Sequence, residues 1–215
     1  LKATFDVTLE VPEFMEAISN MPPSSAEYSD GWKRVKFRTT PPMPTYLLFF
    51  GVGQFVTLPS EDRRVRIVVL PGREKYADFA LRNTHKYLRF FEDYLGVAYP
   101  LPKLDLVAVP DFAFGAMENW GAMLFRENLL LYYPDRTSHS ELKRIGEVIA
   151  HETAHQWFGD LVSPAGWRYI WLNESFATLL SYKALEHVHP EWNAHEMFLM
   201  GEAAAALDRD ALTYS

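Results

Sequence analysis

Residues 148–160, VIAHETAHQWFGD, place three ionisable side chains inside an otherwise apolar helical pattern. His151 and His155 are four positions apart, so on a helix they share one face and both imidazoles can reach one ion. Glu152 stands beside the first histidine, where it can bind a water on that ion. This pattern predicts a zinc site. The same five-residue pattern also arises by chance in unrelated proteins, as two surface histidines and a solvated glutamate.

A catalytic zinc ion needs a third protein ligand and one open position. Glu174 is the candidate, because 18 residues separate it from His155 and it falls in the first turn of the next predicted helix. Antiparallel packing of the two helices is expected to bring this carboxylate to the ion, with Asn173 as the cap of the second helix. The chain contains no cysteine, so histidine and carboxylate side chains are the available ligands.

A zinc ion at this place implies metal-assisted hydrolysis of an amide bond. A bound water has its pKa lowered to about 7, and the metal polarises the substrate carbonyl. Glu152 is expected to take the proton of that water and to pass it to the leaving amine. The metal ligands alone do not distinguish an endopeptidase of the thermolysin type from an exopeptidase.

The segment FGAMENWGAMLF, residues 114–125, bears on that distinction. Gly115, Ala116 and Gly121 permit another backbone to come close, so the segment is a candidate edge strand that pairs with an extended peptide. Glu118 would then neutralise the α-ammonium group of the substrate. The alternative is an ordinary surface carboxylate in a strand.

Hydrophobic periodicity predicts the elements that must position these residues. Strands are expected at 4–11, 32–40, 46–56, 64–72, 103–110 and 121–133. Helices are expected at 74–95 with Gly96 as a C-terminal cap, at 140–158 with Ser140 as N-cap, from 173 to before Pro190, and at 191–212.

The composition is that of a soluble globular protein, with 48% hydrophobic residues. A net charge of −7 without a long Lys/Arg run argues against nucleic acid as a partner. The longest weakly polar run, residues 46–56, is shorter than the roughly 20 residues that cross a bilayer, so we expect no membrane segment. A cytoplasmic location is expected from the lack of cysteine and of a visible anchor, although an upstream signal would be invisible. The oligomeric state is left open.

Three motifs together resemble the aminopeptidase N family of zinc gluzincins. GAMEN at 115–119 is followed by 31 residues, HETAH at 151–155, and 18 more residues before Glu174. The segments TTPPMPTYLLFFGVGQF at 39–55 and WLNESFATLLSY at 171–182 also resemble the framework of that family. The similarity runs across almost the whole chain.

The resemblance implies a role for each motif residue. One zinc ion per chain would be held by His151, His155 and Glu174, with Glu152 as general base. Glu118 would anchor the free amino terminus of a peptide, as part of a substrate-binding segment that comprises Gly115, Ala116, Met117, Glu118 and Asn119. Ala116 is typical of plain aminopeptidases and favours peptides over an epoxide lipid as substrate.

The resemblance also implies an α+β fold in two parts. Residues 1–59 would form the C-terminal part of an N-terminal β-domain, and residues 60–215 the N-terminal part of a thermolysin-like catalytic domain. The family uses a tyrosine beyond the position of Ser215 to stabilise the oxyanion, so we expect the chain to be a fragment. A catalytically silent peptide-binding or receptor module of the same fold is the alternative to a zinc aminopeptidase.

Overall fold

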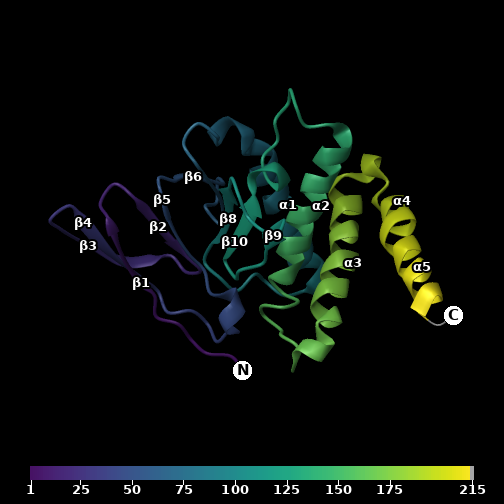
Figure 1. The fold of residues 1–215 in the computed structure, drawn as a ribbon, viewed down its shortest axis with the longest axis horizontal. Helices are drawn as coiled ribbons and strands as arrows, with labels where there is room; N and C mark the ends of the chain where they lie inside the picture. The colour runs from purple at the N-terminus through teal and green to yellow at the C-terminus, as the bar shows by residue number, and fades with distance from the viewer. Residues whose placement is uncertain (214–215) are drawn as a thin grey trace.

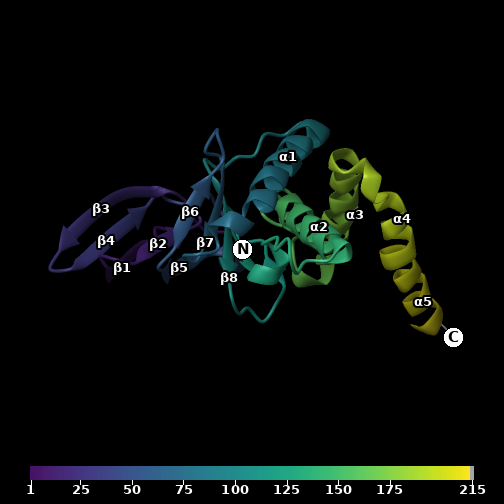
Figure 2. The ribbon, with the colours of Figure 1, turned by 90° about the horizontal axis from the view of Figure 1, so that it is seen from above.

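The computed structural model describes residues 1–213 and places most strands before most helices (Figure 1). Strands from the first sixty residues lie at one end of the molecule, and the helices that follow residue 139 lie at the other (Figures 1 and 2). This arrangement confirms the α+β class.

Ten strands form three sheets within the described residues. An antiparallel sheet has the order β1 (Thr8–Pro12), β4 (Trp32–Phe37), β3 (Pro23–Ser29). A second, two-stranded sheet pairs β2 (Glu16–Ser19) with β5 (Phe50–Gly53). The third has the order β6 (Val56–Pro59), β7 (Val65–Val69), β8 (Leu104–Val109), β10 (Ala122–Arg126), β9 (Ala116–Met117).

The five-stranded sheet is buried on both faces at its centre. Its strands β7, β8 and β10 run parallel, whereas the edge strands β6 and β9 are antiparallel to their neighbours. Ile67 belongs to the main core with the helices, while the next residue, Val68, packs with Ile18 of β2 and with Phe49, which directly precedes β5. A strand covered on both faces needs apolar residues without alternation, which explains the run IVVL at residues 67–70.

Three long helices accompany this sheet: α1 (Asp78–Leu95) and α2 (His139–His155) contact the sheet, and α3 (Trp171–Val188) packs against these two helices. Gly96 follows α1 with φ +66°, so the predicted glycine cap is confirmed. The prediction of Ser140 as the N-cap of α2 was wrong. Ser138 is the cap, because its Oγ accepts the Glu141 N–H while the Glu141 carboxylate accepts the Ser138 N–H, which is a capping box.

The predicted helical segment near the C-terminus is divided into shorter pieces. It contains a 3₁₀ turn (Pro190–Trp192), α4 (Ala194–Phe198), a π-helical stretch (Leu199–Ala203) and α5 (Ala204–Thr213). Within residues 1–213, none of the helices combines the length and the apolar character that a membrane crossing requires.

Two predicted strands are shorter than the sequence pattern indicates. Residues 46–56 form most of a 3₁₀ turn (Thr45–Leu47), then β5 and the start of β6. Gly53 ends β5, and a Cβ there would lie 2.9 Å from the Phe55 ring. Residues 121–133 form β10 and then a 3₁₀ turn (Glu127–Leu129). In contrast, β3 was missed because Pro23 and several serines indicate a turn.

The domain boundary after residue 59 stays a prediction. Strand β6 ends at Pro59 and is paired throughout with β7, from Val56 opposite Val69 to Pro59 opposite Arg66. This pairing ties the last residues of the first predicted domain to the central sheet.

Buried polar side chains join the N-terminal strands to the loop that precedes β10. Lys103 is 4% exposed, and its ammonium group donates to the carbonyls of Ser19 (2.6 Å) and Gly121 (2.7 Å) and pairs with Asp105 (2.8 Å). Gly121 has φ +80°, and a Cβ there would lie 2.6 Å from the Asn20 carbonyl oxygen. Only glycine therefore allows this close approach without strain.

Substitution of Lys103→Met should reduce the free energy of unfolding by about 3 kcal/mol, because it leaves two buried carbonyls without a donor and removes one partner of a buried charge. Urea denaturation of the purified protein measures this change. Lys86→Met, at an exposed position on α1, is the control and should change stability by less than about 0.5 kcal/mol. Equal losses in the two variants would contradict the structural role of Lys103.

Candidate active site

The two motif histidines face each other across one turn of α2. Their Nε2 atoms lie 3.0 Å apart, and the ring centroids are 4.6 Å apart. His155 is 1% exposed, and its Nδ1 lies 2.9 Å from the Phe158 carbonyl oxygen. With the Nδ1 proton donated to that carbonyl, the Nε2 lone pair is directed towards His151 and is free to bind a cation.

Glu174 comes to this pair from the first turn of α3. Its Oε2 atom lies 3.4 Å from His151 Nε2 and 3.5 Å from His155 Nε2. Hydrogen bonds from His151 and then His155 hold the pKa of the Glu174 carboxyl well below its usual value, despite partial burial. The three side chains form a group of ligand atoms that can hold a metal ion. The expected antiparallel approach of the two helices therefore brings the predicted third ligand to the histidines.

Asn173 does not cap α3, so that prediction was wrong. The helix begins at Trp171, and the Asn173 N–H donates to the Ile170 carbonyl inside it. The side chain is 4% exposed, and its Nδ2 lies 3.5 Å from the Tyr46 hydroxyl. Asn173 thus connects the start of α3 to the N-terminal segment.

Glu152 is buried next to the ligand group, with 7% of its surface exposed. Burial raises the pKa of this carboxyl to about 8; the charges of Glu118 and Glu174 add to the rise, while His155 opposes it. A carboxyl with such a pKa can accept and release a proton near neutral pH. Its ligand atom lies within 4.8 Å of those of Glu118 and His155.

Residues 115–119 fall into two groups: some lie near the histidines and Glu152, and the others pack into the protein interior. Strand β9 is the outer strand of the central sheet, and Gly115 and Ala116 line a cavity with His151 and Glu152. Glu118 reaches the group around Glu152 and His155. Met117 packs against the core, and Asn119 is 6% exposed with its Nδ2 placed 3.4 Å from the Leu47 carbonyl.

Sequence reasoning missed Gln156, which positions the Glu118 loop. Gln156 is fully buried; its Oε1 accepts the Gly121 N–H at 3.0 Å and its Nε2 donates to the Glu118 carbonyl at 3.1 Å. A polar residue directly after His155 in an apolar stretch was the available signal. The amide thereby fixes the loop to the helix that carries the histidines.

Tyr46 and Asp160 were missed as well. Burial, together with the charges of Glu118, Asp160 and Glu174, raises the pKa of the Tyr46 hydroxyl well above its usual value, which keeps it protonated. Asp160 is fully buried, and neither of its carboxyl oxygens has a hydrogen-bond partner among the described residues. Burial raises the pKa of this carboxyl well above its usual value. Neither residue has a spacing that singles it out in the sequence.

Two family descriptions match this chain. Residues 79–215 match the peptidase family M1 domain, and residues 1–47 match the peptidase M1 N-terminal domain. The resemblance to the aminopeptidase N family is thereby confirmed.

Curated relatives are similar over the whole chain. A protein of Sulfurisphaera tokodaii named probable aminopeptidase 2 is 46% identical over 99% of the chain and 27% of its own length. Aminopeptidase N of Bos taurus is 42% identical over 100% of the chain and 23% of its own length. The alanine/arginine aminopeptidase of Saccharomyces cerevisiae is 43% identical over 100% and 25%, respectively.

The chain therefore spans about a quarter of the length of these relatives, as the matched shares of 23–27% show. A family domain that covers residues 79–215, and relatives at more than 40% identity over nearly every residue, establish the membership. This chain belongs to peptidase family M1.

Proposed function

We propose that the protein is a zinc-dependent aminopeptidase that hydrolyses the N-terminal peptide bond of peptides. The observation that carries the proposal is the triangle of ligand atoms from His151, His155 and Glu174, with sides of 3.0, 3.4 and 3.5 Å. Ligands at about 2.0–2.1 Å from a tetrahedral zinc ion stand about 3.3–3.4 Å from one another. The donor set and its spacing therefore fit zinc, and relatives named as aminopeptidases support the reaction class.

Bound zinc would supply a lowered pKa for a coordinated water and polarisation of the substrate carbonyl. The chain itself supplies the movement of the proton. Glu152, adjacent to His151 and shielded from solvent, accepts a proton from the attacking water and then donates it to the leaving amine. Because burial raises its pKa to about 8, the Glu152 carboxylate can accept the proton of a water whose pKa is lowered to about 7 without a strongly uphill step.

Selection of the amino terminus is assigned to Glu118. A peptide that pairs with the free edge of β9 would run past the metal ligands, as in other cases of strand addition. The Glu118 carboxylate, within 4.8 Å of the Glu152 group, would receive the α-ammonium of the first residue. A peptide that extends further upstream would leave this charge without a partner, and this disfavours internal cleavage.

The first test is Glu152→Gln in the full-length protein. The variant should retain one zinc ion per chain by elemental analysis, while its kcat/KM on leucine p-nitroanilide should fall by about 10² to 10⁴, because the amide cannot accept a proton. Glu61→Gln, exposed in a loop, is the control and should match the wild type in both measurements. Retained activity after Glu152→Gln would reject the proposed mechanism.

A second prediction concerns the free amino terminus. Wild-type protein should cleave leucinamide and not N-acetyl-leucinamide. Glu118→Gln should lower kcat/KM on leucinamide by about 10², because a charged hydrogen bond is lost, with zinc content unchanged. Asp111→Asn, an exposed carboxylate upstream of β9, serves as the matched control. Cleavage of both compounds at the same rate would point to an endopeptidase and overturn the exopeptidase assignment.

Metal removal should also lower stability, because α2 and α3 share the ligands. With free zinc at about 1,000 times its dissociation constant, binding contributes about 4 kcal/mol to folding. Thermal unfolding of the full-length protein before and after dialysis against a chelator measures this effect, and added zinc should restore the original midpoint. A midpoint that is independent of zinc would argue against a site shared by the two helices.

A further inference from the structure

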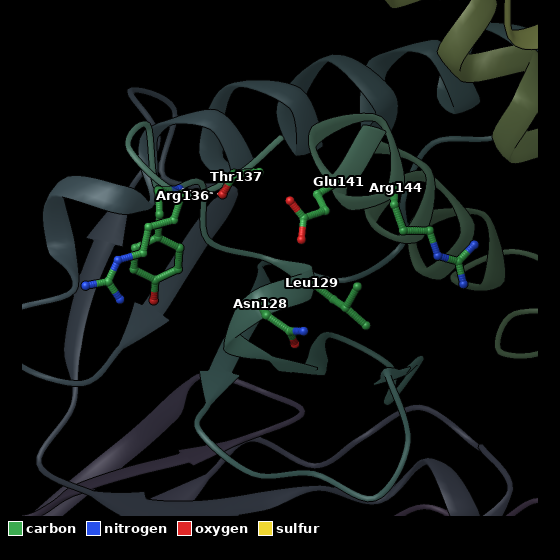
Figure 3. A pocket seen from close by; sticks show the side chains of 7 residues that line it. Asn128, Leu129, Arg136, Thr137, Glu141 and Arg144 are labelled. Carbon is green, nitrogen blue, oxygen red and sulfur yellow. Dashed lines mark hydrogen bonds between the residues drawn. The ribbon is translucent and has the colours of Figure 1, made fainter. Parts of the chain in front are cut away.

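Two neighbouring cavities follow the outer face of α2 away from the metal ligands. The cavity nearer to the ligands is lined by Gly115, Ala116, His151 and Glu152 among others, and the second by Arg136, Thr137 and Glu141 among others. Leu129 and Arg144 line both cavities. Figure 3 shows Arg136 and Arg144 on opposite sides of the second cavity, with Leu129 and Glu141 between them. The two cavities therefore form one groove.

The helix itself sets the direction of this groove. Arg144, Val148 and His151 are spaced four and three residues apart, so they lie in one row on α2. His151 is seven positions after Arg144, which corresponds to about 10 Å along the helix axis. The Arg144 Nη1 donates to Glu147 Oε1 at 2.7 Å, so the guanidinium leans back towards His151.

The groove begins at His151 and Glu152 and continues along α2 to Arg144 and Glu141. Its lining contains His151, Gly115 and Ala116, but neither Glu118 nor Glu174 lines either cavity. A peptide whose ammonium group is bound at Glu118 would therefore enter this groove with the residues that follow the cleaved bond.

Charge along the groove changes from acidic to basic. Glu147 is only 12% exposed and already accepts from Arg144, whose own side chain is 57% exposed. In the second cavity, the Glu141 carboxylate is engaged by Ser138 in the capping box. The Arg136 side chain makes no ion pair within residues 1–213. The accessible charges at the far end are therefore guanidinium groups, although Glu202 also lines the nearer cavity.

We propose that this groove is a binding site for the downstream end of short peptides, in which Arg144 receives the free C-terminal carboxylate. The inference rests on the proposed aminopeptidase function and adds a substrate class to it. Arginine has five N–H donors, and within residues 1–213 the Arg144 guanidinium donates one side-chain hydrogen bond, to Glu147, so other donors remain for a bidentate carboxylate contact. An extended chain advances about 3.3 Å per residue, so a carboxylate two to three residues beyond the cleaved bond reaches Arg144. Tripeptides and tetrapeptides are the preferred substrates.

The test uses the full-length, zinc-loaded protein and peptides of one leucine followed by one to five alanines. Each peptide is supplied as the free acid and as the C-terminal amide, and kcat/KM is measured for both. For the wild type, the ratio of acid to amide should reach about tenfold at two or three alanines and should be smaller at one and at five, because only the intermediate lengths place the carboxylate at Arg144.

Arg144→Gln should bring the ratio of acid to amide to about one at every length, and Arg144→Lys should restore part of the preference. Arg82→Gln, an exposed arginine on α1 that pairs with Asp78, is the matched control and should retain the wild-type ratio. Urea denaturation shows that each variant is folded.

Three outcomes would overturn the inference. In the first, the wild type shows the same kcat/KM for acid and amide at every length. In the second, Arg144→Gln lowers kcat/KM for acid and amide equally. In the third, a peptide with a downstream lysine is preferred to one with a free carboxylate there, which would assign the groove to Glu147 and Glu202. In each case, cleavage of leucine p-nitroanilide, which has no downstream residue, would still support the proposed function. If that compound is not cleaved either, the proposed function fails together with the inference.

Discussion

The rest of the structure depends on one constraint: two helices hold three electron-rich ligand atoms within 3.5 Å of one another. These atoms belong to His151, His155 and Glu174. The helices α2 and α3 must approach closely for this to happen. Gly159 permits the approach, since a Cβ there would lie 3.1 Å from the Asn173 amide, and the Phe158 and Phe176 rings stack at 5.0 Å. A cation at the centre, as proposed, would offset the mutual repulsion of the lone pairs and would couple the packing of the helices to the chemistry of the site.

A second set of buried polar contacts positions the strand that would meet the substrate. Gln156 binds the Glu118 carbonyl and the Gly121 N–H, so the loop before β10 is attached to the same helix as the histidines. From the other side, Asn20 donates to the Trp120 carbonyl, and Lys103 donates to the Gly121 carbonyl. Each contact satisfies a backbone group that would otherwise be buried without a partner. The loop that contains Glu118 is therefore attached both to α2 and to the N-terminal strands.

The sequence predicts well that His151, His155 and Glu174 come together, and it predicts their surroundings poorly. His151 and His155 share a face because of helix geometry alone, and Glu174 follows from the need for a third ligand. Helix α1 and its Gly96 cap also follow from periodicity. In contrast, Gln156, Lys103 and Tyr46 act through partners that are far away in the chain, and a single sequence gives no local signal for such contacts. Strand β3 was missed for the same reason. Its pairing with β4 overrides the turn-like composition of residues 23–29, and a single sequence does not show that pairing.

The site combines parts with different structural support. The ligands and Glu152 belong to two helices in the main core, whereas Glu118 follows an edge strand of two residues, and its loop depends on Asn20 and Lys103. Loss of a contact between the N-terminal strands and residues 119–121 would therefore move Glu118 relative to the histidines without disturbing the group of His151, His155 and Glu174. The proposed recognition of a substrate amino terminus would thus depend on the N-terminal segment, although that segment contributes none of the proposed metal ligands. This dependence gives a physical reason for the two parts of the chain to pack as closely as Gly121 and Asn20 do.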